Sequence, residues 1–193
     1  FTRWDVLEDK SVPDEKIILV MPTWRSWLEE KTAEEFRNSD YFKQYSEFLS
    51  SKLLGDYLKK SNVHLIFYIH PKFRDYLGEF NICQDNIQLI PFGSRPLNDI
   101  MMRCSMLITD YSSVCWDVYY QGKPVLFYQF DYDKYMEVHG SYMDMERELF
   151  GPRLSDCDEL IQAIKDKVET GFAEDPSATE KRMDYFAYID SDN

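Results

Sequence analysis

Short apolar runs rich in β-branched and aromatic residues alternate along this chain with amphipathic segments of helix length. This alternation constrains the fold more than any other feature, because strands covered by helices on both faces read as continuous apolar runs. We therefore predict an α/β fold with an open, doubly wound, Rossmann-like parallel sheet. The predicted strands are at 16–24, 63–71, 86–92, 105–110 and 124–131.

Helical segments lie between and after these runs. Residues 40–61 place apolar side chains near a 3.6-residue period, and Pro96 stands where a first helical turn tolerates proline. Further helices are expected at 96–104, 112–122 and 157–171. The predicted organisation is a linker or interlobe segment at 1–15, a domain at 16–172, and a C-terminal tail or helix at 173–193.

Charge and apolar content exclude several classes of protein. The net charge of −13 over 193 residues argues against a nucleic-acid-binding surface, and no stretch is apolar enough to span a membrane. The acidic excess is uneven, since residues 131–193 hold 17 acids and 7 bases while residues 1–130 hold 18 and 15. The first two-thirds of the chain therefore leave room for a local anion site.

The first residues and the cysteines carry further expectations. The start, FTRWDVLEDK, is charged and lacks an initiator Met, so we expect a piece of a longer protein. The four cysteines lie too far apart for a C-x-x-C pair, which favours reduced thiols and predicts no metal site.

Polar residues gather where the predicted strands end. Ligands of doubly wound sheets bind outside the carboxyl ends of the strands, so this edge is the expected site. The residues at or just after these strand ends are Thr23, Arg25, His70, Lys72, Arg95, Asp110, Ser112, Ser113 and Asp131.

The segment Asp110–Ser113 joins a predicted strand to a predicted helix. The free N–H groups of a helix beginning near Ser112 bind phosphate, and the hydroxyls of Ser112 and Ser113 add donors. The alternative is that Asp110 or Ser112 only caps the helix. No G-x-x-x-x-G-K-[ST], G-x-G-x-x-G or G-x-S-x-G motif competes with this segment.

The three histidines have different prospects. His70 follows a strand and precedes a proline, where an imidazole can donate to a phosphate and, if protonated, neutralise a leaving group. The alternative is a structural histidine at the rim of the sheet. His64, at the start of the same strand, is expected to be structural. His139 is expected in a loop beside Gly140, from which its side chain can reach a ligand.

Several charged residues are weaker candidates. Arg25, Lys72, Arg74 and Arg95 all follow strand ends and can pair with phosphates, or can be solvated surface charges. Glu146 can accept hydrogen bonds from a ribose or polyol hydroxyl, or can be exposed.

Several of these segments together resemble one enzyme family. PTWR, HPK at 70–72, the block at 96–135 that contains ITDYSSV and KPVLFY, and MERELFGP are similar to the CDP-glycerol glycerophosphotransferases, the teichoic acid polymerases and primases. The resemblance spans about residues 16–172, and ITDYSSV followed by KPVLFY is its most specific part.

The resemblance implies the C-terminal, nucleotide-binding lobe of a two-lobed GT-B enzyme. Such an enzyme transfers glycerol phosphate from CDP-glycerol to a hydroxyl of a lipid-linked polymer, without a cofactor or metal. His70 would be catalytic. The nucleotide-binding residues would be Thr23, Arg25, Lys72, Arg95, Asp110, Ser112, Ser113 and Glu146.

The resemblance also sets expectations about the parent protein. The acceptor would be held by a missing N-terminal lobe, so the fragment alone would be inactive. The parent would lie at the cytoplasmic face of the cell membrane. A nucleotide-sugar glycosyltransferase lobe and a non-catalytic receiver-like or interaction module remain alternatives, and CDP-ribitol remains an alternative donor.

Overall fold

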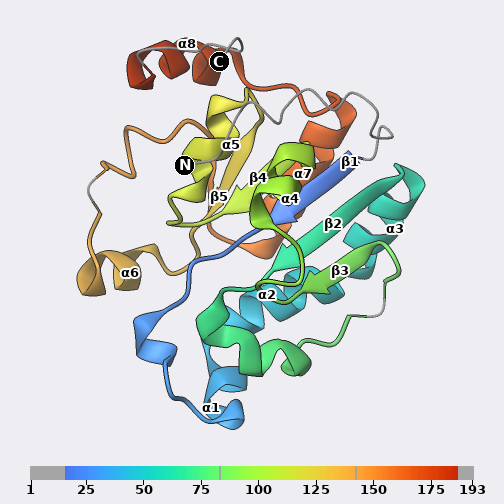
Figure 1. The fold of residues 1–193 in the computed structure, drawn as a ribbon, viewed down its shortest axis with the longest axis vertical. Helices are drawn as coiled ribbons and strands as arrows, with labels where there is room; N and C mark the ends of the chain where they lie inside the picture. The colour runs from blue at the N-terminus through green and yellow to red at the C-terminus, as the bar shows by residue number, and fades with distance from the viewer. Residues whose placement is uncertain (1–15, 83, 142, 187–193) are drawn as a thin grey trace.

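A six-stranded parallel sheet forms the centre of the molecule in the computed structural model, which describes residues 16–186 except 83 and 142 (Figure 1). The strand order is β3-β2-β1-β4-β5-β6, which is the doubly wound order that the sequence predicted. The strands are β1 (Lys16–Val20), β2 (Val63–Tyr68), β3 (Ile87–Ile90), β4 (Met106–Thr109), β5 (Val125–Tyr128) and β6 (Arg153–Leu154).

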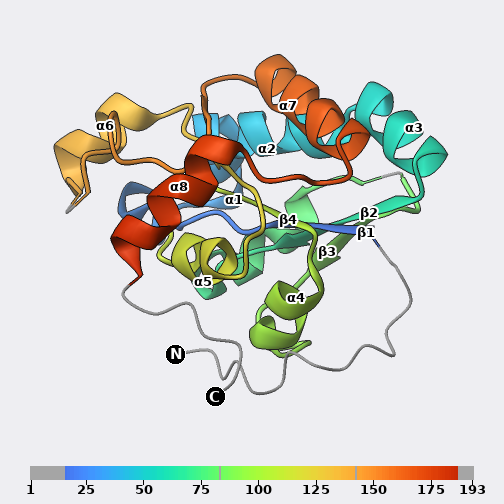
Figure 2. The same ribbon diagram turned by 90° about the horizontal axis from the view of Figure 1, so that it is seen from above.

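Helices cover both faces of this sheet. Seen from above in Figure 2, α2, α3 and α7 lie over one face, whereas α4 and α5 lie under the other. The helices are α1 (Ala33–Asn38), α2 (Asp40–Ser50), α3 (Lys52–Lys60), α4 (Leu97–Arg103), α5 (Val114–Tyr120), α6 (Tyr132–Val138), α7 (Cys157–Glu169) and α8 (Pro176–Tyr185), with 3-10 helices at Ser26–Leu28 and Pro71–Glu79.

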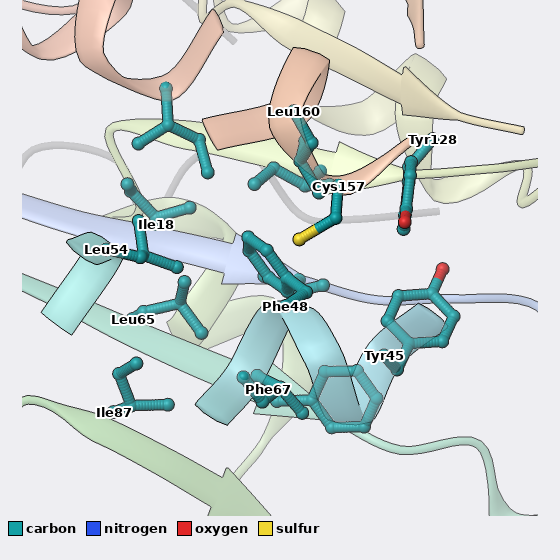
Figure 3. Close-up of a cluster of buried hydrophobic side chains, with 14 of the residues drawn as sticks. Ile18, Tyr45, Phe48, Leu54, Leu65, Phe67, Ile87, Tyr128, Cys157 and Leu160 are labelled. Atoms are coloured by element: carbon teal, nitrogen blue, oxygen red, sulfur yellow. The ribbon is translucent and has the colours of Figure 1, made fainter. Parts of the chain in front are cut away.

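Each face of the sheet has its own hydrophobic core. One core gathers side chains such as Phe48 of α2, Phe67 of β2 and Leu160 of α7, which Figure 3 shows converging. The other core packs Leu107 of β4 against Tyr119 of α5 and their neighbours. Because both faces are buried, the central strands read as continuous apolar runs, as the sequence analysis assumed.

The prediction missed the helices α1 and α6, and two further details of it were wrong. The segment 40–61 is not one helix, since Ser51 is extended (φ −60°, ψ 113°) and its hydroxyl accepts a hydrogen bond from Leu54 N as the cap of a second helix. The short strand β6, which pairs with β5, was not predicted at all. A two-residue strand has no periodicity that a sequence pattern can show.

Beyond residue 172, α8 packs onto the second core, where the Tyr119 hydroxyl donates to Ala178 O. The predicted segment 1–15 and the last seven residues lie outside the described residues. The predicted limits of the domain therefore stay a prediction. No helix in the described part is long and apolar enough to cross a membrane.

Candidate functional site at the strand switch point

The strands β1 and β4 pair in parallel at the centre of the sheet. The strand order reverses between them, because β2 and β3 lie on one side of β1 while β4, β5 and β6 lie on the other. The carboxyl ends of β1 and β4 are joined by Asp110, whose Oδ1 accepts hydrogen bonds from Thr23 N (2.8 Å) and Tyr111 N (2.6 Å). Asp110 is fully buried. It therefore shapes the turn that enters α5.

Arg25 is also fully buried, so it is not the solvated surface charge that was one of its two predicted roles. Its Nε and Nη2 donate to the two carboxylate oxygens of Asp131 (2.7 and 3.0 Å). Its Nη1 donates to Thr23 O (2.7 Å) and lies 2.9 Å from Asp110 Oδ2. Burial alone would lower the pKa of Arg25, but the Asp110 and Asp131 carboxylates raise it well above the usual value. The guanidinium thus ties together the ends of β1, β4 and β5.

The turn after Asp110 leaves donors available. The helix α5 begins at Val114, and its cap residue Ser113 is exposed and makes no side-chain capping bond. The Ser112 hydroxyl accepts only a long bond from Val114 N (3.5 Å). Within the described residues, the backbone N–H groups of Ser112 and Ser113 have no hydrogen-bond partner. Capping therefore does not account for these two serines.

His70 lies at the end of β2, next to β1, and its ring stacks on Trp24 with centroids 6.0 Å apart. Its Nδ1 accepts a hydrogen bond from Lys72 N (3.3 Å), which leaves Nε2 to carry the proton of the neutral ring. Partial burial and the Lys72 charge lower the pKa of His70, although Asp110 opposes this shift. At pH values above the ordinary pKa of about 6.5, this shift favours the neutral ring, which can donate through Nε2.

The remaining predicted residues are spread more widely. Thr23 has a buried hydroxyl without a hydrogen-bond partner beside the Asp110 turn, so it is available to a ligand. Lys72 is exposed and pairs with Glu29 (2.6 Å). Arg95 is exposed on the loop after the edge strand β3. Glu146 is exposed in the loop before β6 and follows Met145, whose sulfur lies 3.7 Å from Gln129 Nε2, the group that donates to Asp110 O.

An aromatic cluster beside the turn was missed by the sequence analysis. Tyr111 stacks on Tyr135 of α6 with centroids 3.5 Å apart, and its hydroxyl donates to Asp131 (3.2 Å). Trp24 lies between His70 and the exposed His139, whose ring centroid is 6.4 Å away. Trp24 stands at the end of the predicted strand 16–24, which was a signal for this cluster, whereas Tyr135 gave none.

The model of one protein family matches almost the whole chain. It is described as CDP-Glycerol:Poly(glycerophosphate) glycerophosphotransferase, and it matches residues 5–193. The chain belongs to this family. Membership confirms the resemblance seen in the sequence and replaces the receiver-like alternative.

Two curated relatives illustrate the match. The minor teichoic acid biosynthesis protein GgaB of Bacillus subtilis is 28% identical over 202 residues, covering 100% of this chain and 22% of the relative. The teichoic acid glycerol-phosphate transferase of Staphylococcus aureus is 30% identical over 164 residues, covering 81% and 37%. The chain thus spans well under half of the length of these family members.

A solved structure shows the same fold. The wall teichoic acid polymerase TagF, as a histidine-to-asparagine variant soaked with CDPG, superposes with a TM-score of 0.63 at 23% identity. The superposition covers 97% of this chain and 44% of that one. This similarity confirms a GT-B-like α/β lobe.

Proposed function

We propose that this chain is the donor-binding lobe of a transferase that moves glycerol phosphate, or a related polyol phosphate, from a CDP-activated donor to a hydroxyl of a cell-surface polymer. The observation that carries the proposal is the turn at Ser112 and Ser113, where two unpaired backbone N–H groups lie at the switch point of the sheet. Family membership and the names of the relatives support the same reaction class.

The chemistry follows from the donors around this turn. In the transfer, an acceptor hydroxyl oxygen forms a bond to the phosphorus that carries glycerol, the bond from that phosphorus to the CMP oxygen breaks, and the acceptor proton is lost to a base. The N–H groups of Ser112 and Ser113, together with the Ser113 hydroxyl, which makes no capping bond, would stabilise charge on the diphosphate oxygens. The neutral His70 ring would donate a hydrogen bond from Nε2 to the phosphate of the departing CMP, and the buried Thr23 hydroxyl would add a further donor.

The rest of the reaction would need the part of the protein that this chain lacks. We propose that an N-terminal lobe holds the lipid-linked acceptor, and that the parent protein works at the cytoplasmic face of the cell membrane. Among the described residues, no group of three or more His, Cys, Asp and Glu side chains gathers to hold a metal ion. The donor site is proposed to rely on the N–H groups of the turn and on His70.

Calorimetric titration with CDP-glycerol, CDP and UDP tests the donor site. We expect the cytidine compounds to bind more tightly than UDP, and we expect Ser113→Ala and His70→Ala each to weaken CDP-glycerol binding by about tenfold, the value of one charge-assisted hydrogen bond. Ser50→Ala and His64→Ala are matched controls, because Ser50 ends α2 and His64 begins β2, away from the switch point. Equal affinity for all three nucleotides, together with unchanged binding by both site variants, would refute the proposal.

A further inference from the structure

Two adjoining pockets, of about 480 and 400 Å³, lie beside the carboxyl end of β5. They share Asp40, Asp131 and Lys134 as a common wall, and together we call them the trough. One pocket extends towards Trp27 and Tyr41, and the other extends towards Gln129, Tyr132 and Arg153. The helix α6, which carries Lys134, follows β5 in the chain and projects away from the sheet in Figure 1.

Each pocket is lined by a buried residue with an unsatisfied polar atom. Tyr41 is 2% exposed, and its hydroxyl has no hydrogen-bond partner. Gln129 is also 2% exposed; its Nε2 donates to Asp110 O (2.8 Å), while its Oε1 has no partner. Buried polar groups are normally paired, because leaving them unpaired costs free energy. A hydroxyl donor and an amide acceptor are therefore left unpaired on residues that line the trough.

Both ends of the trough carry an aromatic ring next to a cation. Lys134 Nζ lies 4.9 Å from the centre of the Trp27 ring, and the Arg153 guanidinium lies 4.4 Å from the centre of the Tyr132 ring. Between them stands the exposed carboxylate of Asp40. Aromatic faces cover C–H groups, while carboxylates accept hydrogen bonds from hydroxyls.

The charges of the trough select against ions of either sign. Acidic side chains outnumber basic ones in the lining of the trough, so binding of a phosphate or nucleotide is disfavoured. The acids are Glu35, Asp40, Asp131 and Asp133, and the bases are Lys134 and Arg153. A cation is disfavoured too, since two of the carboxylates are already engaged. Asp131 is held by Arg25, and Glu35 accepts from Thr32 in a capping box.

We propose that the trough binds an uncharged polyhydroxylated unit, a polyol or a sugar. Its hydroxyls would donate to Asp40 and Gln129 Oε1 and accept from Tyr41, and its C–H face would pack on Trp27. The trough is linked to the donor turn through one guanidinium, because Arg25 bonds both Asp131 of the trough and Asp110 of the turn. That this unit belongs to the acceptor polymer rests on the proposed function, whereas the binding itself does not.

Titration of the ¹⁵N-labelled chain with ribitol, methyl glucoside and glycerol 3-phosphate, followed by NMR, tests this inference. We expect saturable shifts of the Trp27 indole signal with the two uncharged ligands, at dissociation constants on the order of 1–10 mM, and weaker binding of the phosphate. Asp40→Asn, followed at the Trp27 indole signal, and Trp27→Ala, followed at the Lys134 amide signal, should each weaken ribitol binding by about tenfold. Asp56→Asn, an exposed acid of α3, is the matched control for Asp40.

Each other outcome overturns the inference. Shifts that do not saturate, shifts that survive both trough variants, or tighter binding of glycerol 3-phosphate would show that the trough does not hold an uncharged unit. The Ser112 and Ser113 amide signals report the donor site in the same spectra when CDP is added. Failure at one site is therefore distinguishable from failure at the other.

Discussion

Replacing Arg25 by methionine tests whether the buried guanidinium holds the strand ends together. The change removes the partner of two carboxylates, of which Asp110 is fully buried and Asp131 is 9% exposed at its side chain. It also removes the donor to Thr23 O. Removing one member of a buried ion pair costs about 3–5 kcal/mol, because the remaining charge stays buried without compensation.

For a chain of this size, each kcal/mol lowers the melting temperature by roughly 2–4 °C, so Arg25→Met should melt about 6–20 °C below the parent chain. Urea denaturation should show a lower midpoint with an unchanged slope. Arg37→Met is the matched control, since Arg37 forms an ion pair with Glu79 while 48% of its side chain is exposed. Such surface pairs contribute about 0–1 kcal/mol.

A second substitution should restore part of the stability that Arg25→Met loses. Arg25→Met combined with Asp131→Asn removes one of the stranded charges, so the double variant should be more stable than Arg25→Met alone. An Arg25→Met variant that melts with the Arg37→Met control would refute the idea that this network stabilises the site. So would a double variant less stable than Arg25→Met.

Two further predictions concern single positions. A Cβ on Gly151 would lie 1.9 Å from Val125 O of β5, so Gly151→Ala should lower the free energy of unfolding by about 1–3 kcal/mol in urea denaturation. Gly78→Ala is the control and should be nearly neutral, because no atom lies within 4 Å of its added Cβ. Equal stability of the two variants would contradict this packing. NMR titration should place the pKa of His70 below its ordinary value of about 6.5, because burial and Lys72 disfavour the imidazolium. Since the folded chain then binds fewer protons, His70 contributes stability above about pH 6.5 that is lost as the pH falls through its lower folded pKa, and His70→Ala should reduce this loss. A His70 midpoint at or above 6.5 would show that the ring is solvated or paired with an acid.

The sequence predicted the sheet because every central strand is buried on both faces, which leaves an unbroken apolar run. It also predicted that the edge carrying Thr23, His70 and Asp110 would hold the polar residues, since parallel strands all end on one side. The break at Ser51 escaped prediction, because the apolar period continues across it from α2 into α3.

The charged residues could not be sorted by sequence. Arg25, Lys72 and Arg95 look alike as cations after strand ends, yet Arg25 is buried between two carboxylates, Lys72 pairs with Glu29, and Arg95 is exposed at the edge. Burial of Arg25 depends on Asp131, more than a hundred positions later, and no local pattern reports that contact. The trough escaped for the same reason, since its walls come from distant parts of the chain.

The two carboxylates that hold Arg25 come from the second half of the sheet, while Arg25 itself follows the first strand. Contacts across such a long separation in sequence form only after both halves have docked, because closing a large loop costs entropy before the contact is gained. We therefore expect the contacts of the Arg25 guanidinium to form after the folding transition state, so that they slow unfolding. In stopped-flow kinetics, Arg25→Met should unfold faster than the parent chain, with little change in the refolding rate.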